Sequence, residues 1–288
     1  MKRHLYALLP LLLLLLLGCA TISVSEKNLL HSDKGPPPVQ ELGDGYAMDT
    51  VSVRHVDGAV SQGIWLSNPN STATILYWGG NEFRIDLAAG DVIPALAKAR
   101  VDIVMFDYRG HGRSKGSLTA ETLMTDAADV LRFVKAKAKN KVVVYGHSMG
   151  SSVAGLTVRF IPVDGVIMEG AITNVRDIVS SHVPWYYKPF VKVDVEPKLL
   201  VADNASFVRG YPGALLVLAG ENDNAVPVRL QKALWEQAAT TNKAIHVFRD
   251  YGHNGLMHSE EFPGVLSAFL TRQLPQSNAG SEAKIGSR

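Results

Sequence analysis

The stretch VVVYGHSMGSS, residues 142–152, leads from a valine-rich segment through a glycine-flanked serine into a helix. The valines are typical of a buried strand, and the apolar residues of 153–160 recur at helical spacing. Such a turn needs small flanks, because strand and helix pass close together, and Gly146 and Gly150 satisfy this need. Ser148 at the tip then stands clear of its own backbone, beside the positive end of the helix. We therefore predict that Ser148 is a nucleophile.

This strand, serine turn and helix resemble the nucleophile elbow of the α/β-hydrolase superfamily. The five-residue pattern Gly-x-Ser-x-Gly also arises by chance, so its place between a strand and a helix carries the resemblance. The similarity covers about residues 46–274. It implies an acyl-enzyme formed on Ser148, and a serine here argues against haloalkane dehalogenation, whose nucleophile in this fold is a carboxylate.

The order of elements predicts an α/β fold with a mostly parallel central sheet and helices on both faces. Alternating residues of 46–66 indicate an N-terminal hairpin around Asp57-Gly58. Buried strands and amphipathic helices then alternate along the chain. No internal repeat is visible, and residues 46–274 are expected to form one domain, followed by a polar tail at 275–288.

Active sites of such sheets gather at the carboxyl ends of the strands, and the first of these ends is the turn WGGN at 78–81. The resemblance implies that the backbone N–H groups of Asn81 and Met149 bind the oxyanion. Gly79 stands where the superfamily commonly has a histidine, but donation from backbone does not need that side chain. An ordinary tight turn would use the same glycines.

The next strand end carries DYRGHGRS at 107–114, which resembles the D-x-R-G-x-G-x-S signature of many α/β-hydrolases. We expect Asp107 and Arg109 to form an ion pair that supports this loop, not a pair that takes part in chemistry. His111 is expected to be structural or exposed.

The remaining members of a triad follow the last two strands. Asp223 occupies the acid position of a turn that resembles G-x-x-D-x-x-V-P, with Glu221 as the fallback. His253, in a Gly-His-Asn loop, completes the chain order Ser, Asp, His of this fold. The resemblance implies that His253 deprotonates Ser148 while Asp223 orients the imidazole, with no metal and no organic cofactor.

Residues 171–210 interrupt the alternation at the place where the superfamily inserts its lid, and this insertion is short. Trp185, Tyr186 and Phe190 are candidates for lining an acyl pocket, although packing against the core explains such a cluster equally well. A small lid suits compact esters or a flexible acyl chain.

The N-terminus has the pattern of a secretory signal at residues 1–18, because Lys2 and Arg3 precede an apolar run that is too short to span a bilayer. Leu-Leu-Gly-Cys resembles a bacterial lipobox, with Cys19 acylated as the first mature residue. Cleavage after Ala20 or an uncleaved anchor are the alternatives. The lipobox predicts a lipid-anchored protein of the bacterial cell envelope, and the residue after Cys19 favours the outer membrane.

Residues 19–45 are expected to form a lipidated, extended tether, because they are polar and contain three consecutive prolines at 36–38. Without residues 1–18, the 29 basic residues lose Lys2 and Arg3 and equal the 27 acidic ones. The neutral balance argues against nucleic acid as a partner. A single cysteine excludes intramolecular disulfides.

Three functional hypotheses remain open at this point. The first is a serine hydrolase that cleaves carboxylic esters or thioesters of small-molecule or acyl-chain substrates. The second is an aminopeptidase-like serine peptidase of the same fold, which would need acidic residues to hold a substrate ammonium. The third is a non-catalytic binding protein of the envelope. The sequence leaves the oligomeric state open.

Overall fold

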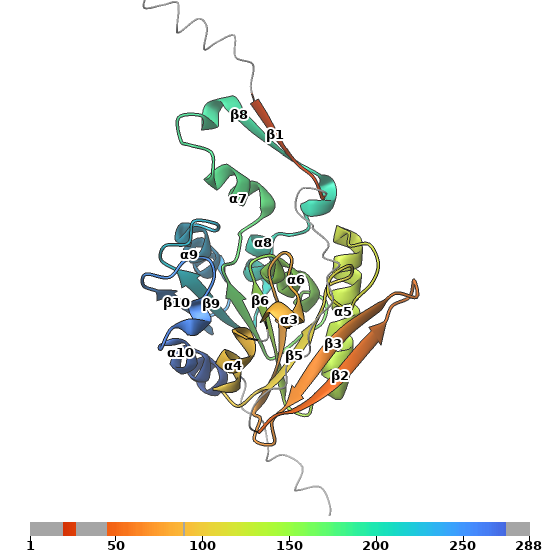
Figure 1. The fold of residues 1–288 in the computed structure, drawn as a ribbon. Coiled ribbons are helices and arrows are strands. Elements are labelled where there is room, and N and C mark those ends of the chain that lie inside the picture. Colours follow the sequence, from red (N-terminus) through yellow and green to blue (C-terminus); the bar gives the residue numbers. More distant parts are fainter. Residues whose placement is uncertain (1–19, 27–44, 89, 275–288) are drawn as a thin grey trace, which may run out of the picture.

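The computed structural model describes residues 20–26, 45–88 and 90–274. Eight strands form a central sheet in the order β10-β9-β7-β6-β4-β5-β3-β2 (Figure 1). Their bounds are β2 Ala47–Arg54, β3 Val60–Ser67, β4 Ala73–Trp78, β5 Asp102–Phe106, β6 Lys141–His147, β7 Gly165–Glu169, β9 Ala214–Gly220 and β10 Lys243–Phe248.

The sheet is parallel from β5 to β10, and β2 and β3 join it antiparallel as a hairpin. The predicted hairpin and the mostly parallel sheet are therefore confirmed. Strands β4, β5, β7 and β9 are buried along their whole length, which explains why each reads as a continuous apolar run.

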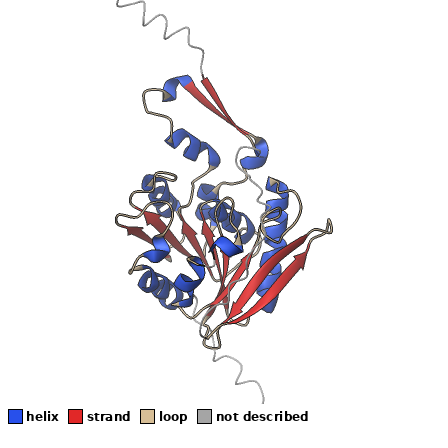
Figure 2. Ribbon diagram, viewed as in Figure 1, coloured by secondary structure: helices blue, strands red, loops and turns tan. Residues whose placement is uncertain are grey.

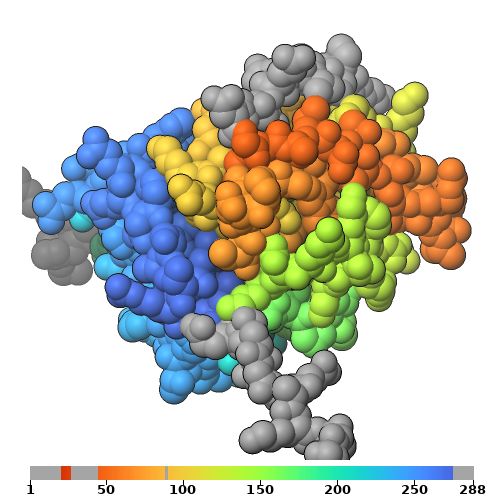
Figure 3. All heavy atoms as spheres, turned by 90° about the horizontal axis from the view of Figure 1, so that it is seen from below, coloured from red at the N-terminus to blue at the C-terminus, as the bar shows by residue number. Residues whose placement is uncertain are grey.

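Helices cover both faces of this sheet (Figure 2). On one face α4 contacts α10, and on the other α5, α6, α8 and α9 follow one another in contact. Figure 3, seen from below, shows the segment around α4 beside the blue C-terminal segment that holds α10. The bounds are α3 Ile85–Ala88, α4 Val92–Ala97, α5 Ala120–Lys137, α6 Met149–Val158, α8 Asn204–Gly210, α9 Val228–Gln237, α10 Phe262–Ala268, the 3-10 helix η3 Leu256–His258 and the π-helix η4 Phe269–Gln273.

A small cap stands over the carboxyl end of the sheet. It contains α7 Val175–Ser181, η1 Lys188–Phe190, β8 Val191–Val195 and η2 Pro197–Leu199, together with β1 Ala20–Val24, which pairs with β8 as a separate two-stranded sheet. We call residues 171–203 with β1 the cap. The segment 204–210, expected to belong to the lid, is instead α8, which packs between α6 and α9.

The strand β1 departs from the extended tether expected at 19–45. Val24 is buried with Val175, Val195 and Leu199 in a small hydrophobic cluster of the cap. Glu26, two residues after the strand, accepts a hydrogen bond from the backbone N–H of Ala120 at the start of α5. The beginning of the described chain is therefore part of the folded molecule.

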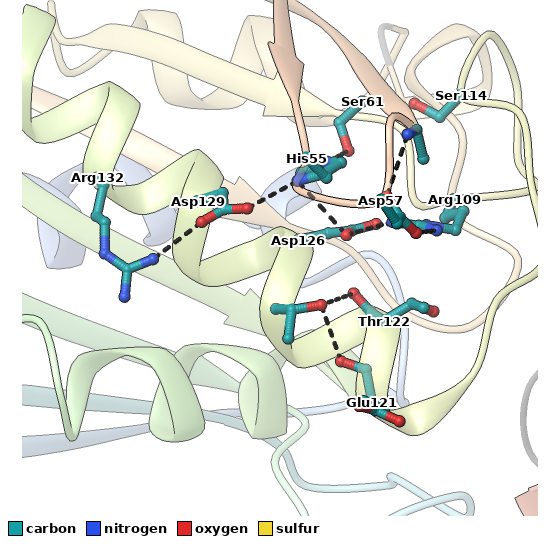
Figure 4. Close-up of polar contacts among 12 residues, drawn as sticks. His55, Asp57, Ser61, Arg109, Ser114, Glu121, Thr122, Asp126, Asp129 and Arg132 are labelled. Carbon is teal, nitrogen blue, oxygen red and sulfur yellow. Dashed lines mark hydrogen bonds and ion pairs between the residues drawn. The ribbon is translucent and has the colours of Figure 1, made fainter.

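The loop after β5 joins the hairpin to α5, but not through the expected pair of Asp107 and Arg109. Arg109 forms ion pairs with Asp126 on α5 and with Asp57 in the β2–β3 turn (Figure 4). Asp107 accepts hydrogen bonds from the backbone N–H groups of Ile85 and Arg113. The arginine reaches away from its neighbour because two carboxylates face it from other elements.

Candidate active site

The turn between β6 and α6 holds Ser148 in a strained conformation, with φ 53° and ψ −119°. Holding a non-glycine residue at such a positive φ costs about 1–3 kcal/mol, and residues of this kind are typical of functional sites. The flanking residues must be glycines because the backbone on each side passes too close for a side chain. A Cβ on Gly146 would lie 2.3 Å from the carbonyl oxygen of Gly150, and one on Gly150 would lie 2.1 Å from that of Trp78.

His253 bridges Ser148 and Asp223, although the three residues come from three separate loops. Its Nε2 lies 2.9 Å from Ser148 Oγ, and its Nδ1 lies 2.9 Å from Asp223 Oδ2. An ionised carboxylate only accepts, so Nδ1 carries the proton and Nε2 is left to accept from the serine hydroxyl. Gly170 gives the imidazole room, because a Cβ there would lie 3.0 Å from His253 Cε1.

Asp223 is buried and accepts four hydrogen bonds. Its Oδ1 accepts from the backbone N–H groups of Ala225 and Val226, and its Oδ2 from His253 and from Nε2 of Gln231. Burial alone would raise the pKa of Asp223, but the hydrogen bonds from His253 and Val226 outweigh it and lower the pKa below its usual value. Glu221, the fallback acid, is exposed.

Gln231 on α9 is a site residue that the sequence analysis missed. Its amide donates to Asp223 Oδ2 at 3.1 Å and to the carbonyl of Val226 at 2.9 Å, which ties the acid to the helix behind it. The available signal was a polar residue on the inward, otherwise apolar face of that helix, where Leu234 is fully buried.

The turn after β4 places Asn81, and the start of α6 places Met149, beside the same cavity as Ser148. A Cβ on Gly80 would lie 3.4 Å from the Cβ of Ser148, so this backbone passes directly over the serine. The hydroxyl of Tyr108 donates to the carbonyl of Gly79 at 2.8 Å and fixes the turn. The two predicted donors are therefore brought to the site.

An apolar cavity of about 290 Å³ opens beside Ser148 and His253. Its walls come from α5, α6 and the cap, and Lys198 is the charged side chain at its edge. The principal apolar residues are Leu123, Met124, Leu156, Ile178, Val179 and Leu199. The volume lies near the lower end of the range for small-molecule sites.

Trp185, Tyr186 and Phe190 do not line this cavity, contrary to the expectation for them. Their exposed fractions are 81%, 54% and 44%. The chain turns away from the cavity after α7, and the cap contributes aliphatic side chains from α7 and from the segment after β8 in their place.

A second cavity, of about 280 Å³, lies on the other side of Asn81. Its lining is more polar and includes Arg84, His147 and Glu169. Glu169 is buried at the end of β7, and Nε2 of His147 donates to the carbonyl of His253 at 3.2 Å. The serine turn thus has an apolar cavity on one side and a polar one on the other.

Two further predictions concern residues outside the triad. His111 is fully buried and structural, with Nδ1 at 3.2 Å from the carbonyl of Arg109. Cys19, the predicted site of acylation, lies outside the described residues. Within the described ranges no cluster of side chains has the makings of a metal site, and no helix there is long and apolar enough to cross a bilayer.

Comparison with known sequences identifies relatives of this chain. A profile described as the alpha/beta hydrolase fold matches residues 79–187. Lysophosphatidylserine lipase ABHD12 of Gallus gallus is 31% identical over 229 residues, which are 70% of this chain and 59% of the relative. The Macaca fascicularis protein of the same name is 30% identical over 72% of this chain and 58% of its own length. The chain thus spans less than two thirds of these relatives.

Solved structures give the same fold. The esterase Pf2001 of Pyrococcus furiosus superimposes with a TM-score of 0.65 at 19% identity, covering 83% of this chain and 99% of that one. An acetyl xylan esterase from Paenibacillus sp. R4 does so with 0.62 at 16% identity, covering 85% and 89%. At these identities the solved structures show the fold alone. The family profile and the sequence relatives show that the chain belongs to the α/β-hydrolase superfamily.

Proposed function

We propose that this hydrolase cleaves carboxylic esters through an acyl-enzyme on Ser148. The observation that carries the proposal is the imidazole of His253, which lies 2.9 Å from both the hydroxyl of Ser148 and the carboxylate of Asp223. His253 accepts the serine proton as Oγ attacks the acyl carbonyl and then donates it to the leaving alcohol. His253 next takes a proton from a water molecule that attacks the acyl-enzyme, and returns it to Ser148 Oγ as the acid leaves.

Asp223 and two backbone N–H groups stabilise the charges that develop during the reaction. The carboxylate, kept ionised by its hydrogen bonds, stabilises the imidazolium and holds its tautomer. The N–H groups of Asn81 and Met149 receive the oxyanion, and the positive end of α6 adds to their effect.

The two cavities suggest the substrate class. The apolar cavity beside Ser148 suits a single flexible acyl chain, and the polar cavity beyond Asn81 suits a hydrophilic alcohol. Relatives named lysophosphatidylserine lipase fit this division by their names. Lysophospholipids are therefore the first natural esters to test, with acyl thioesters as the second.

The aminopeptidase-like alternative is less well supported. A substrate ammonium would need a carboxylate in the cavity beside the serine, and the charged side chain at its edge is Lys198. A non-catalytic binding protein would have no use for a strained serine turn aligned with an imidazole.

The test compares hydrolysis by the purified protein of p-nitrophenyl esters from acetate to palmitate, lysophospholipids, acyl thioesters and aminoacyl anilides, each with Ser148→Ala as control. Esters and lysophospholipids should be cleaved, with covalent labelling of Ser148 by a fluorophosphonate. Cleavage of anilides alone, or ester cleavage retained by Ser148→Ala, would refute the proposal.

A further inference from the structure

The far end of the cap exposes an unusual group of aromatic residues. Residues 184–190, PWYYKPF, are exposed without exception, and Trp185, Tyr186, Tyr187 and Phe190 have exposed fractions of 81%, 54%, 53% and 44%. The rings pack on one another, with centroids 5.7 Å apart for the first two and 4.7 Å for the two tyrosines. We call 184–190 the aromatic segment. Exposed apolar clusters of this kind mark interaction sites.

The aromatic segment lies beside the start of the described chain. Strands β1 and β8 are parallel, and Ala20 pairs with Val191. Val191 follows Phe190 directly, and Ala20 follows Cys19. Figure 1 shows the start of β1 together with η1 at the end of the cap that is distant from the central sheet. Whatever is attached at residue 19 or before it therefore begins next to the aromatic segment.

The composition on both sides of this junction suits lipid. The sequence before Ala20 is apolar from Leu5 to Leu17. Trp and Tyr prefer the interface between lipid and water, because their rings are apolar and each carries one polar group. Lys188 and Lys192 supply positive charge, and no acidic residue occurs between 183 and 193. Lysine side chains there can extend to lipid phosphates.

We propose that the aromatic segment inserts into the interface of a lipid bilayer, beside the attachment point of the N-terminus. The cap then rests on the bilayer, and the central sheet faces away from it. The cap lines part of the apolar cavity with residues of α7 and of the segment around η2. These residues lie between the bilayer-facing end of the cap and Ser148. A lipid ester leaving the bilayer reaches the site through the cap. Docking stands without the proposed function; only the delivery of substrate rests on it.

Trp185 reports on docking without any need for activity. The full-length protein is mixed with vesicles of phosphatidylethanolamine and phosphatidylglycerol whose acyl chains carry bromine, which quenches nearby indoles. Trp65 and Trp78 are buried in the core, and Trp235 is half-buried on α9, so Trp185 is the indole within reach. We expect quenching that disappears in Trp185→Phe. Quenching that persists in this variant, or is absent from the original protein, overturns the proposal.

Two other occupants of the aromatic segment would give different results, which lipid-free fluorescence and sedimentation measure. If it is covered by another part of this chain, Trp185 emission in the absence of lipid will already be that of a buried indole. If it is covered by a second copy, sedimentation will show an oligomer that Trp185→Ser dissociates. Either result overturns the lipid assignment.

Activity provides the second arm. The variant Trp185→Ser/Tyr186→Ser/Tyr187→Ser should cleave an ester embedded in vesicles at least about tenfold more slowly, the effect of losing burial of one large aromatic side chain. Its turnover of soluble p-nitrophenyl butyrate should not change. Phe160→Ser, which removes an aromatic ring 78% exposed just after α6, is the matched control and should alter neither rate. Equal losses of rate on the embedded and the soluble ester contradict the proposal. If the protein cleaves no ester at all, the quenching experiment alone decides it.

Discussion

Backbone strain distinguishes the residue that we propose as the nucleophile. Ser148 is held at a positive φ because the glycines on both sides let strand and helix approach. Alanine and glycine at this position therefore have different consequences, although both remove the hydroxyl. Alanine keeps the strain, while glycine accepts this backbone conformation without it.

We expect Ser148→Ala and Ser148→Gly to lower kcat/KM for p-nitrophenyl butyrate by ~10⁴-fold or more, since the groups of a triad act as a unit. We also expect Ser148→Gly to be the more stable of the two by about 1 kcal/mol, after the entropy of the unfolded glycine offsets part of the relief. Steady-state kinetics and urea unfolding measure the two effects. A glycine variant less stable than the alanine variant would contradict the strain argument.

Gln231 gives the second prediction at the residue scale. Gln231→Met keeps the volume and removes the donor to Asp223 Oδ2. Because a hydrogen bond to a charged group contributes about 1.5 kcal/mol, kcat should fall about tenfold with little change in KM. Gln237→Met is the control, as it lies on the same helix and accepts from Arg209 far from the acid. An unchanged kcat in Gln231→Met would refute the positioning role.

The residues of the site could be predicted to different degrees. Ser148 and Asp223 were predicted because each lies in a local motif at a strand end, and His253 because its loop also follows a strand and completes the chain order. Gln231 has no motif of its own, and its direction is fixed only when α9 packs behind the acid. The pairing of Arg109 with Asp57 and Asp126 likewise depends on elements that the motif around Arg109 does not contain.

Among the elements, α7 is expected to control the length of acyl chain that the proposed site accepts, because Ile178 and Val179 line its apolar cavity. Val179→Trp fills part of the apolar cavity from the cap, so kcat/KM for a palmitate ester should fall about tenfold, equivalent to about 1.4 kcal/mol, while that for acetate is unchanged. Arg176→Trp places the same side chain on an exposed position of the same helix and is the control. Equal effects of both variants on palmitate would show that the cavity does not hold the chain.

The hairpin of β2 and β3 gives a prediction about how the stability of the fold depends on pH. Its turn carboxylate, Asp57, has its pKa lowered to about 2, chiefly by the hydrogen bond from Arg109. With a lower pKa in the folded than in the unfolded state, Asp57 stabilises the fold above about pH 4, and the contribution is lost as pH falls toward 2. Asp57→Asn should therefore melt below the original protein at pH 7 and together with it at pH 2.

The control for this prediction is Asp49→Asn, which removes a carboxylate from an exposed position on β2 of the same hairpin. Melting curves at several pH values between 2 and 7 provide the measurement. If Asp57→Asn differs from the original protein by the same amount at every pH, the ion pair does not contribute as argued.

The cap is the element that the sequence predicted least well. A cluster of aromatic residues is typical of packed surfaces, so Trp185, Tyr186 and Phe190 were reasonable candidates for a pocket. Which side of a lid faces the site depends on the contacts that fix the lid in place. Here β8 is fixed by its pairing with β1. That pairing joins segments 171 residues apart in the chain, and no periodic pattern in either one predicts it.

On the scale of the whole molecule, the fold class was predictable because strands buried on both faces must be continuous apolar runs and the helices between them must be amphipathic. The orientation that we propose for the molecule at a lipid surface was not predictable. It follows from the register of two strands, which brings Ala20 beside Val191 and hence the N-terminal attachment beside the aromatic segment.

The same register bears on how the chain is processed. Acylation of Cys19 after removal of residues 1–18 leaves β1 complete, since the strand begins at Ala20, whereas cleavage after Ala20 would remove its first residue. We therefore expect the mature protein to begin with a lipid-modified Cys19, and Cys19→Ala to abolish this modification. Mass spectrometry of the N-terminus and membrane fractionation measure both, with Ser23→Ala as a control for substitution near the anchor. A mature chain that begins at Thr21 without lipid would contradict the anchor and would leave membrane binding to the cap alone.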